Sequence, residues 1–190
     1  MQEFGSDVQP SYRERWGEPL PLSFFEQDAR EVAMGLLGAV LLRHDDDGGF
    51  RWGRVTETEA YLGEHDMASH ARFGRTKRTE VMYGQPGRSY VYLIYGMYHM
   101  LNVVAAPVGV PQAVLIRAIE PLGGVDGKVD GPGKLTRALG IDMSFNGLPL
   151  SAAPLSIHSG EQVREPVVTP RIGIDYAGEW RDAPLRFLAS

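Results

Sequence analysis

The chain has 190 residues, a formal net charge of −5, 43% hydrophobic and 23% charged residues, and no cysteine. This length and balance are typical of one soluble globular domain, and the acidic total argues against a general nucleic-acid coat protein. A chain without cysteine has no disulfide, thiolate nucleophile, iron–sulfur cluster or cysteine-ligated zinc.

The N-terminal segment 1–19 has mixed charge, two prolines and no periodicity, which predicts an extended arm before a single domain over 20–190. Its first residues lack a basic and an apolar stretch, so we expect no signal peptide. The longest uncharged apolar run, 32–42, is about half the length of a membrane span. We therefore expect a cytoplasmic protein without membrane contact.

Apolar residues at helical spacing predict one helix over 22–37, with Ser23 as a candidate N-cap. The segments 39–42 and 50–61 flank the sequence Asp-Asp-Asp-Gly-Gly, which predicts a strand–turn–strand hairpin. The other expected elements are a helix over 64–71, a basic loop over 72–80, β-rich runs over 88–94, 97–106 and 113–120, a loop over 121–134, a helix over 134–139, weak strands in 141–170, and closing strands at 171–174 and 185–188. A helix followed by antiparallel hairpins predicts an α+β fold.

The segment 69–98 differs from the rest of the chain because it combines basic and aromatic residues. Its charge is +4, and it also contains one phenylalanine and five tyrosines. This combination is typical of a nucleic-acid-binding surface, although a solvated loop beside a hydrophobic strand would give the same composition. Its basic residues are Arg72, Arg75, Lys77, Arg78 and Arg88.

Two acidic residues stand two positions apart in the predicted strand 50–61. Alternation places Glu57, Glu59 and Tyr61 on one face. Acidic residues are uncommon in strands, and a buried one has a raised pKa that suits acid–base chemistry. An exposed polar stripe is the alternative interpretation of the same spacing.

The tyrosines of 88–98 indicate a second candidate site. Tyr90 and Tyr92 share a strand face, whereas Tyr95 falls in the turn before a glycine. A side chain at a turn projects beyond the sheet and can wedge into a DNA duplex. A tyrosine-rich core hairpin with satisfied hydroxyls is the alternative.

Other polar residues point less strongly to chemistry. His65, Asp66 and His70 lack the i, i+4 spacing of helical metal ligands, so we expect no metal site. Arg117 lies in an apolar strand and needs a partner if it is buried, for which Glu59 is a candidate. None of the three lysines lies in an apolar run, so a Schiff-base amine is not expected.

Several segments together resemble the alkyladenine (3-methyladenine) DNA glycosylases, and they follow one another in family order over most of 22–188. The matching segments are Val-Thr-Glu-Thr-Glu-Ala-Tyr-Leu-Gly at 55–63, Ser-His-Ala-Arg at 69–72, Pro-Gly-Arg-Ser-Tyr-Val-Tyr-Leu-Ile-Tyr-Gly-Met-Tyr at 86–98, Val-Leu-Ile-Arg-Ala-Ile-Glu-Pro at 114–121, Gly-Pro-Gly-Lys-Leu-Thr-Arg-Ala-Leu at 131–139, and Ala-Gly-Glu-Trp at 177–180 with Pro-Leu-Arg-Phe at 184–187. The segment 141–170 matches poorly. The resemblance implies one compact domain around a curved antiparallel sheet, with a hairpin inserted toward DNA.

The resemblance also implies a role for individual positions. Glu59 matches the catalytic glutamate, Arg117 an arginine that helps to hold the nucleophilic water, and Ile172 a residue whose carbonyl assists. Tyr95 matches the aromatic residue that fills the gap left in the base stack. The residues that match those sandwiching the flipped base are Tyr61, His70 and Tyr92, and Asn102 matches a residue that discriminates among purines by crowding a guanine 2-amino group.

The expected activity is that of a monofunctional, monomeric and cofactor-free DNA glycosylase. It would flip alkylated or deaminated purines out of duplex DNA and hydrolyse the glycosyl bond, with 3-methyladenine, 7-methylguanine, hypoxanthine and ethenoadenine as candidates. The product would be an abasic site for a downstream endonuclease. Two alternatives remain: a non-catalytic module that binds damaged or single-stranded DNA, and a glycoside hydrolase that uses Glu57 and Glu59.

Overall fold

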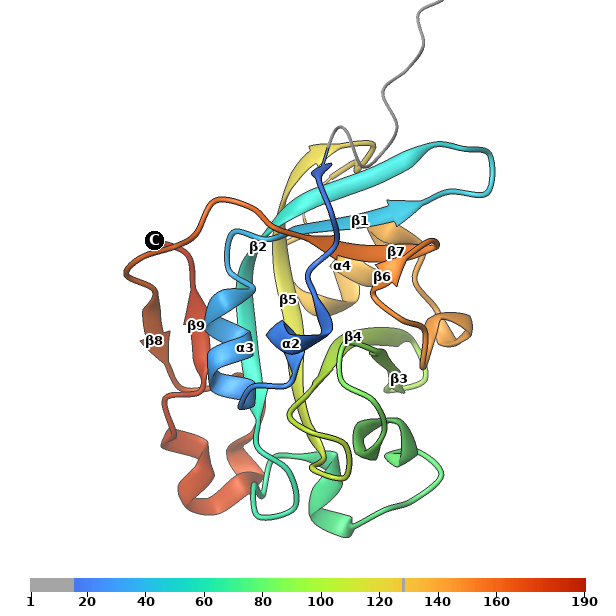
Figure 1. Cartoon of the computed structure of the whole chain (residues 1–190). Coiled ribbons are helices and arrows are strands. Elements are labelled where there is room, and N and C mark those ends of the chain that lie inside the picture. The colour runs from blue at the N-terminus through green and yellow to red at the C-terminus, as the bar shows by residue number, and fades with distance from the viewer. Residues whose placement is uncertain (1–15, 128) are drawn as a thin grey trace, which may run out of the picture.

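The computed structural model describes residues 16–127 and 129–190, and within them nine strands form one antiparallel sheet (Figure 1). The path through the sheet is β3-β4-β5-β2-β1-β7-β6, while β9 pairs with both β2 and β8. The strands are β1 (Val40–His44), β2 (Phe50–Tyr61), β3 (Ser89–Ile94), β4 (Tyr98–Ala105), β5 (Gln112–Gly123), β6 (Ser151–Ala152), β7 (Leu155–His158), β8 (Val167–Thr169) and β9 (Arg186–Leu188). The predicted α+β fold with a single antiparallel sheet is confirmed.

The long strands β2 and β5 form the centre of the sheet and position the site. β2 pairs with β5 along one edge, and along its other edge it changes neighbour from β1 to β9. The register with β5 is irregular around Glu57, where β-bulges bend the strand. Beyond this bend Thr58, Glu59 and Ala60 are all buried, so this part of β2 has no face in solvent.

The helices are short and cover the sheet (Figure 1). Apolar side chains of α3 pack on β2 and β5, and the hydroxyl of Thr58 donates to the carbonyl of Ala33 in that helix at 2.8 Å. The helices are α2 (Leu22–Phe25), α3 (Ala29–Gly35) and α4 (Pro132–Leu139), and the 3-10 helices are η1 (His70–Phe73), η2 (Glu80–Tyr83), η3 (Met143–Phe145) and η4 (Asp175–Asp182).

The prediction of one helix over 22–37 is wrong, because the chain breaks at Asp28. The Asp28 side chain caps α3 by accepting from the backbone N–H of Arg30. The side chain of Gln112, at the start of β5, accepts from the N–H of Ala29 at 2.7 Å and donates to Asp28. Ser23 caps nothing, because α2 has no side-chain cap.

Two further predicted elements are wrong for a related reason. Over 64–71 the chain makes turns, because the Asp66 carboxylate accepts from the N–H groups of Leu62 and Ala68 and so competes with a helix. Residues 171–174 form no strand, since the Ile172 N–H donates to the Glu59 side chain and not to a neighbouring strand. The predicted closing strand at 185–188 is confirmed as β9, which pairs antiparallel with β8.

Part of the predicted arm can be compared with the structure, while residues 1–15 lie outside the described residues. The Trp16 ring packs 5.2 Å from both the Phe50 and the Trp52 ring, and Pro19 forms a β-bridge with His158. The described end of the segment is therefore packed against the domain. Among the helices of the described residues, none has the length and apolar character required to cross a bilayer.

Candidate active site

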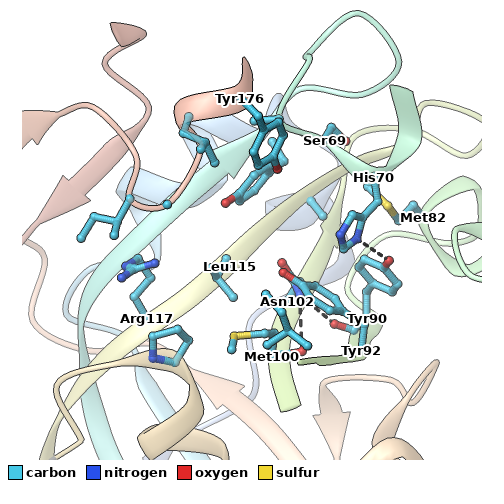
Figure 2. Close-up of a pocket in the computed structure, with 18 of the residues that line it drawn as sticks. Ser69, His70, Met82, Tyr90, Tyr92, Met100, Asn102, Leu115, Arg117 and Tyr176 are labelled. Carbon is cyan, nitrogen blue, oxygen red and sulfur yellow. Dashed lines mark hydrogen bonds between the residues drawn. The ribbon is translucent and has the colours of Figure 1, made fainter. Parts of the chain in front are cut away.

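A cavity of about 190 Å³ opens between the β3–β4 hairpin and the segment that leads into η4 (Figure 2). Strands β2, β3, β4 and β5 and the 3-10 helices η1, η2 and η4 contribute residues to its lining. Six aromatic side chains line it, together with the polar side chains of Ser69, Asn102 and Arg117. The aromatic residues are Tyr61, His70, Tyr90, Tyr92, Tyr95 and Tyr176.

One wall of the cavity is a packed group of three rings. His70 Nδ1 lies 2.9 Å from the hydroxyl of Tyr90, and the His70 ring lies 4.5 Å from the Tyr92 ring (Figure 2). Burial is the main cause that lowers the pKa of His70 to about 4, and the nearby Arg78 and Arg72 charges act in the same direction. The imidazole is therefore neutral at physiological pH.

A polar residue is fixed on the inner side of the cavity. Asn102 is buried on β4, and its Nδ2 donates to the carbonyl of Tyr90 on β3 at 3.0 Å. This bond holds the side-chain amide in one orientation toward the cavity.

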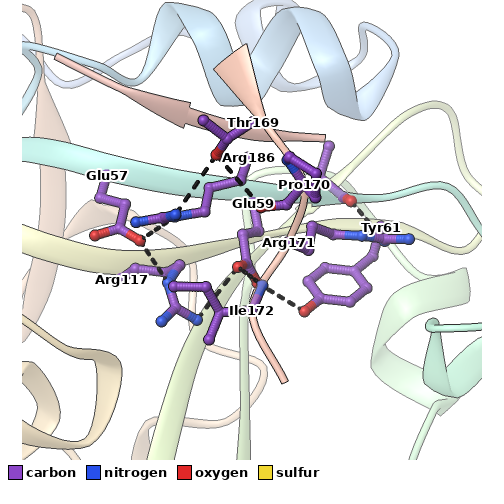
Figure 3. Close-up of polar contacts among 10 residues, drawn as sticks. Glu57, Glu59, Tyr61, Arg117, Thr169, Pro170, Arg171, Ile172 and Arg186 are labelled. Carbon is purple, nitrogen blue, oxygen red and sulfur yellow. Dashed lines mark hydrogen bonds and ion pairs between the residues drawn. The ribbon is translucent and has the colours of Figure 1, made fainter. Parts of the chain in front are cut away.

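Glu59 lies immediately behind the cavity wall, and its side chain is 0% exposed. Oε1 accepts from the Ile172 N–H at 2.8 Å and pairs with Arg117 Nη1 at 3.3 Å, while Oε2 accepts from the Tyr61 hydroxyl at 2.8 Å (Figure 3). Each of these three partners lines the cavity. The predicted pairing of Arg117 with Glu59 is therefore observed, and it joins the carboxylate to the cavity wall.

Opposing effects act on the pKa of Glu59. Burial is the largest and raises the pKa, whereas the Arg117 charge, the Ile172 N–H, the Tyr61 hydroxyl and the Arg171 charge all lower it. Burial and the neighbouring Glu59 charge also raise the pKa of Tyr61 well above its usual value, so Tyr61 remains a neutral donor.

Glu57 holds the same arginine from its other side. Its Oε1 accepts from Arg117 Nε at 2.7 Å and from Arg186 Nε at 2.6 Å (Figure 3). Both acids reach Arg117, which confirms that they share a face. The alternative of an exposed stripe is wrong, since neither side chain is exposed.

A buried ion pair supports this arrangement, and the sequence analysis missed it. Arg171 donates to the two carboxylate oxygens of Asp66 at 2.6 and 2.9 Å and to the Ala60 carbonyl at 2.9 Å, with both charged side chains 0% exposed. Its guanidinium also lies 4.7 Å from the centre of the Tyr61 ring. The sequence could have indicated this pair, because Arg171 precedes apolar residues and a buried arginine requires an acidic partner.

The three residues considered as metal ligands are separated in the structure. His65 packs against Trp180, His70 contacts Tyr90, and Asp66 binds Arg171. In the part of the chain that the structure describes, no group of three histidine or acidic side chains could hold a metal ion.

The tip of the β3–β4 hairpin carries Tyr95, which is 82% exposed. The Met97 N–H donates to the Ile94 carbonyl at 3.1 Å, and the two residues between them have positive φ, 53° at Tyr95 and 67° at Gly96. This is a two-residue primed turn, in which tyrosine is strained and glycine is not. The expected projection of Tyr95 beyond the sheet is confirmed.

The basic residues differ in what they contact. Arg75 forms a two-bond ion pair with Glu80, and the Arg78 guanidinium lies 5.1 Å from the centre of the Tyr92 ring. Lys77 is exposed in the same loop. Of these three, Arg78 contacts a ring of the cavity wall, and all three remain candidates for DNA backbone contacts.

Arg72 and Arg88 each donate to a backbone carbonyl of the protein. Arg72 donates to the Met67 carbonyl and stacks on aromatic rings. Arg88 lies at the opposite end of β3 from the hairpin tip and donates to the Gly147 carbonyl at 2.6 Å. Arg88 does not line the cavity, and this bond gives no support to its predicted contact with DNA.

Residues 23–190 match the family model described as methylpurine-DNA glycosylase. The chain belongs to the methylpurine-DNA glycosylase family. Membership makes it a DNA repair enzyme that hydrolyses N-glycosyl bonds, which confirms the resemblance noted in the sequence.

Bacterial relatives provisionally named 3-methyladenine DNA glycosylase are similar over most of this glycosylase. A protein of Myxococcus xanthus is 49% identical over 171 residues, which cover 88% of each chain. One of Anaeromyxobacter dehalogenans is 51% identical over 170 residues, covering 88% of this chain and 82% of the relative. One of Bacillus cereus is 48% identical over an alignment of 193 residues, which covers 88% of this chain and 93% of the relative.

Proposed function

We propose that this glycosylase flips alkylated or deaminated purines from duplex DNA into the aromatic cavity and hydrolyses their glycosyl bond with water. The observation that carries the proposal is the position of Glu59, a carboxylate held behind an aromatic cavity by three residues of its wall. The relatives' names, which include 3-methyladenine, also support an alkylated purine as substrate.

Glu59 has the chemistry required of a base. A carboxylate accepts about four hydrogen bonds, and the contacts with Ile172, Arg117 and Tyr61 use three of them. The remaining site is on Oε2, where a water molecule that enters with the substrate can bind. The carboxylate takes a proton from this water, and its charge stabilises the oxocarbenium-like sugar as the base departs.

The cavity wall suits a positively charged base. A purine alkylated at N3 or N7 carries a positive charge, which the electron-rich faces of Tyr61 and Tyr92 attract. His70 presents a neutral ring to such a base, because its pKa is about 4. An imidazolium at this position would repel the same ligand.

Two further residues support extrusion and selection of the base. Tyr95 projects from the hairpin tip and can fill the space that a flipped nucleotide leaves in the stack. Asn102, whose amide is fixed at the cavity lining, is the residue that we assign to discriminate among purines by crowding the 2-amino group of guanine. No lysine stands among the described residues that line the cavity, so water is the nucleophile and the product is an abasic site without strand cleavage.

The alternative functions fit the site less well. A module that only binds DNA needs rings and positive charge but no buried acid. A glycoside hydrolase needs two available carboxyl groups, whereas Glu57 is held between Arg117 and Arg186.

Single-turnover release of bases from labelled duplexes tests the proposal. The substrates are hypoxanthine, 3-methyladenine, 7-methylguanine and ethenoadenine, with undamaged adenine as the reference. Glu59→Gln should bind a hypoxanthine duplex as tightly as the wild type but excise it about 10²- to 10⁴-fold more slowly. The matched control, Glu120→Gln, changes an exposed acid on β5 and should excise normally. Normal excision by Glu59→Gln would refute the assignment.

A further inference from the structure

The exposed aromatic surface beside the cavity is larger than the proposed reaction requires. Phe73 at the end of η1 is 71% exposed, and Tyr176 in η4 is 61% exposed. The Arg72 guanidinium lies between them, 4.4 Å from the centre of the Phe73 ring and 5.0 Å from that of Tyr176. Segments about a hundred residues apart in sequence thus form one stack of ring, cation and ring.

The charge of Arg72 is not neutralised within this stack. In residues 16–127 and 129–190, no carboxylate lies within ion-pair distance of Arg72, whose hydrogen-bond partner is the Met67 carbonyl. The neighbouring Arg75, in contrast, is paired with Glu80. The stack therefore presents two apolar ring faces and an uncompensated positive charge.

The stack is continuous with the cavity, because Tyr176 belongs to both. Tyr176 lines the cavity and reaches toward it from η4, with Ile172 contributing further exposed apolar surface (Figure 2). Exposed apolar surface next to a binding cavity is typical of an interaction site. Whatever contacts this surface lies beside the molecule that occupies the cavity.

We propose that Phe73 and Tyr176, spaced by Arg72, bind a nucleotide that neighbours the flipped lesion in the same DNA. A nucleotide combines a planar base with an anionic phosphate, and the stack offers rings for the first and a cation for the second. The proposal rests on the proposed function, since it takes the occupant of the cavity to be DNA. It assigns to Phe73 and Tyr176 a contact outside the base pocket.

Binding to lesion duplexes from which one neighbouring base has been omitted tests the proposal. Stacking energies per base correspond to a loss of about 5- to 150-fold in affinity, which is the loss expected for Phe73→Ala on an intact lesion duplex. Omission of the contacted base should weaken binding by the wild type but should not weaken Phe73→Ala further. Phe73→Trp should restore the affinity because it supplies a ring, and Phe73→Leu should not.

The controls separate this contact from the fold and from the reaction. Val167→Ala shortens an exposed apolar residue on β8 and should bind as the wild type does. Phe73 is exposed, so its variants should unfold at the wild-type urea midpoint. The proposal is overturned if Phe73→Ala binds the intact duplex normally, or if it responds as the wild type does to base omission at every neighbouring position. The proposed function is tested separately. It would be refuted if the wild type failed to excise any of the damaged bases, and that assay uses no Phe73 variant.

Discussion

The buried pair of Asp66 and Arg171 allows a quantitative test of how the site is supported. Asp66→Asn preserves the size of the side chain but removes the charge that compensates Arg171. Both side chains are 0% exposed, so the remaining guanidinium charge would be buried without a counter-ion. Loss of one partner from a buried pair costs about 3–5 kcal/mol of the free energy of unfolding.

Urea denaturation followed by far-ultraviolet circular dichroism measures this change. With a slope of about 2–3 kcal/mol per molar urea for a chain of this size, the midpoint should fall by about 1–2.5 M. The matched control is Glu80→Gln, which breaks a two-bond pair with Arg75 of similar geometry at the surface, where the side chains are 57% and 60% exposed. Its midpoint should stay within experimental error of the wild type. A midpoint for Asp66→Asn as high as that of the control would refute the reasoning.

The other predictions concern the hairpin, the base pocket and the basic loop. Tyr95→Asn should raise the free energy of unfolding by about 1 kcal/mol in urea titrations, because asparagine tolerates positive φ, while binding to a lesion duplex weakens. The pKa of His70 is about 4 in the folded chain and 6.5 in the unfolded chain. Between pH 6.5 and pH 4 the unfolded chain therefore binds a proton that the folded chain does not, and the free energy of unfolding falls as the pH decreases. His70→Asn should therefore lose less stability than the wild type between pH 7 and pH 4.5, and an equal loss would contradict the assignment. Lys77→Gln should reduce the slope of log K against log salt by about one, whereas Arg75→Gln should change it less, because Glu80 already pairs with Arg75.

Much of the sheet can be predicted from local pattern because its strands are joined by hairpins. The Asp- and Gly-rich turn separates β1 from β2, and Tyr95-Gly96 separates β3 from β4. In both cases the flanking β-branched and aromatic residues favour strands. The glycines favour the turns, whereas Tyr95 is strained in its turn.

The turns over 64–71 have a local cause in Asp66, but one other physical cause explains the break in the predicted helix 22–37, the missed ion pair of Asp66 and the absent strand at 171–174. In each of these cases a polar side chain forms a hydrogen bond or ion pair with a group that is distant in sequence. The local sequence pattern predicts a different partner for that group, or none. Gln112 takes the N–H of Ala29 and so stabilises the break in the predicted helix. Arg171 binds Asp66 across 105 positions, and Glu59 takes the N–H of Ile172 across 113. Spacing within one segment contains no information about such partners.

The depth of Glu59 also could not be obtained from alternation. In a strand with one face in solvent, alternate residues are exposed, yet Thr58, Glu59 and Ala60 are buried in succession. The cause is tertiary, because α3 covers one side of β2 while Ile172 and Arg117 cover the other. The resemblance to a family identified the residue, and only the packing shows how the protein holds its charge.

Charge balance offsets the cost of burying the Glu59 carboxylate. Isolated charges of either sign would be too costly to bury, and a carboxyl group would then become neutral. Here each acid has an arginine partner, and the formal charges of the buried cluster sum to zero. The cluster comprises Glu57, Glu59 and Asp66 with Arg117, Arg171 and Arg186. Because Arg117 is shared by two of the acids, a change at Glu57 alters the field at Glu59 without touching the cavity. The charge state of Glu59 therefore depends on the whole cluster of three acids and three arginines and not on Arg117 alone.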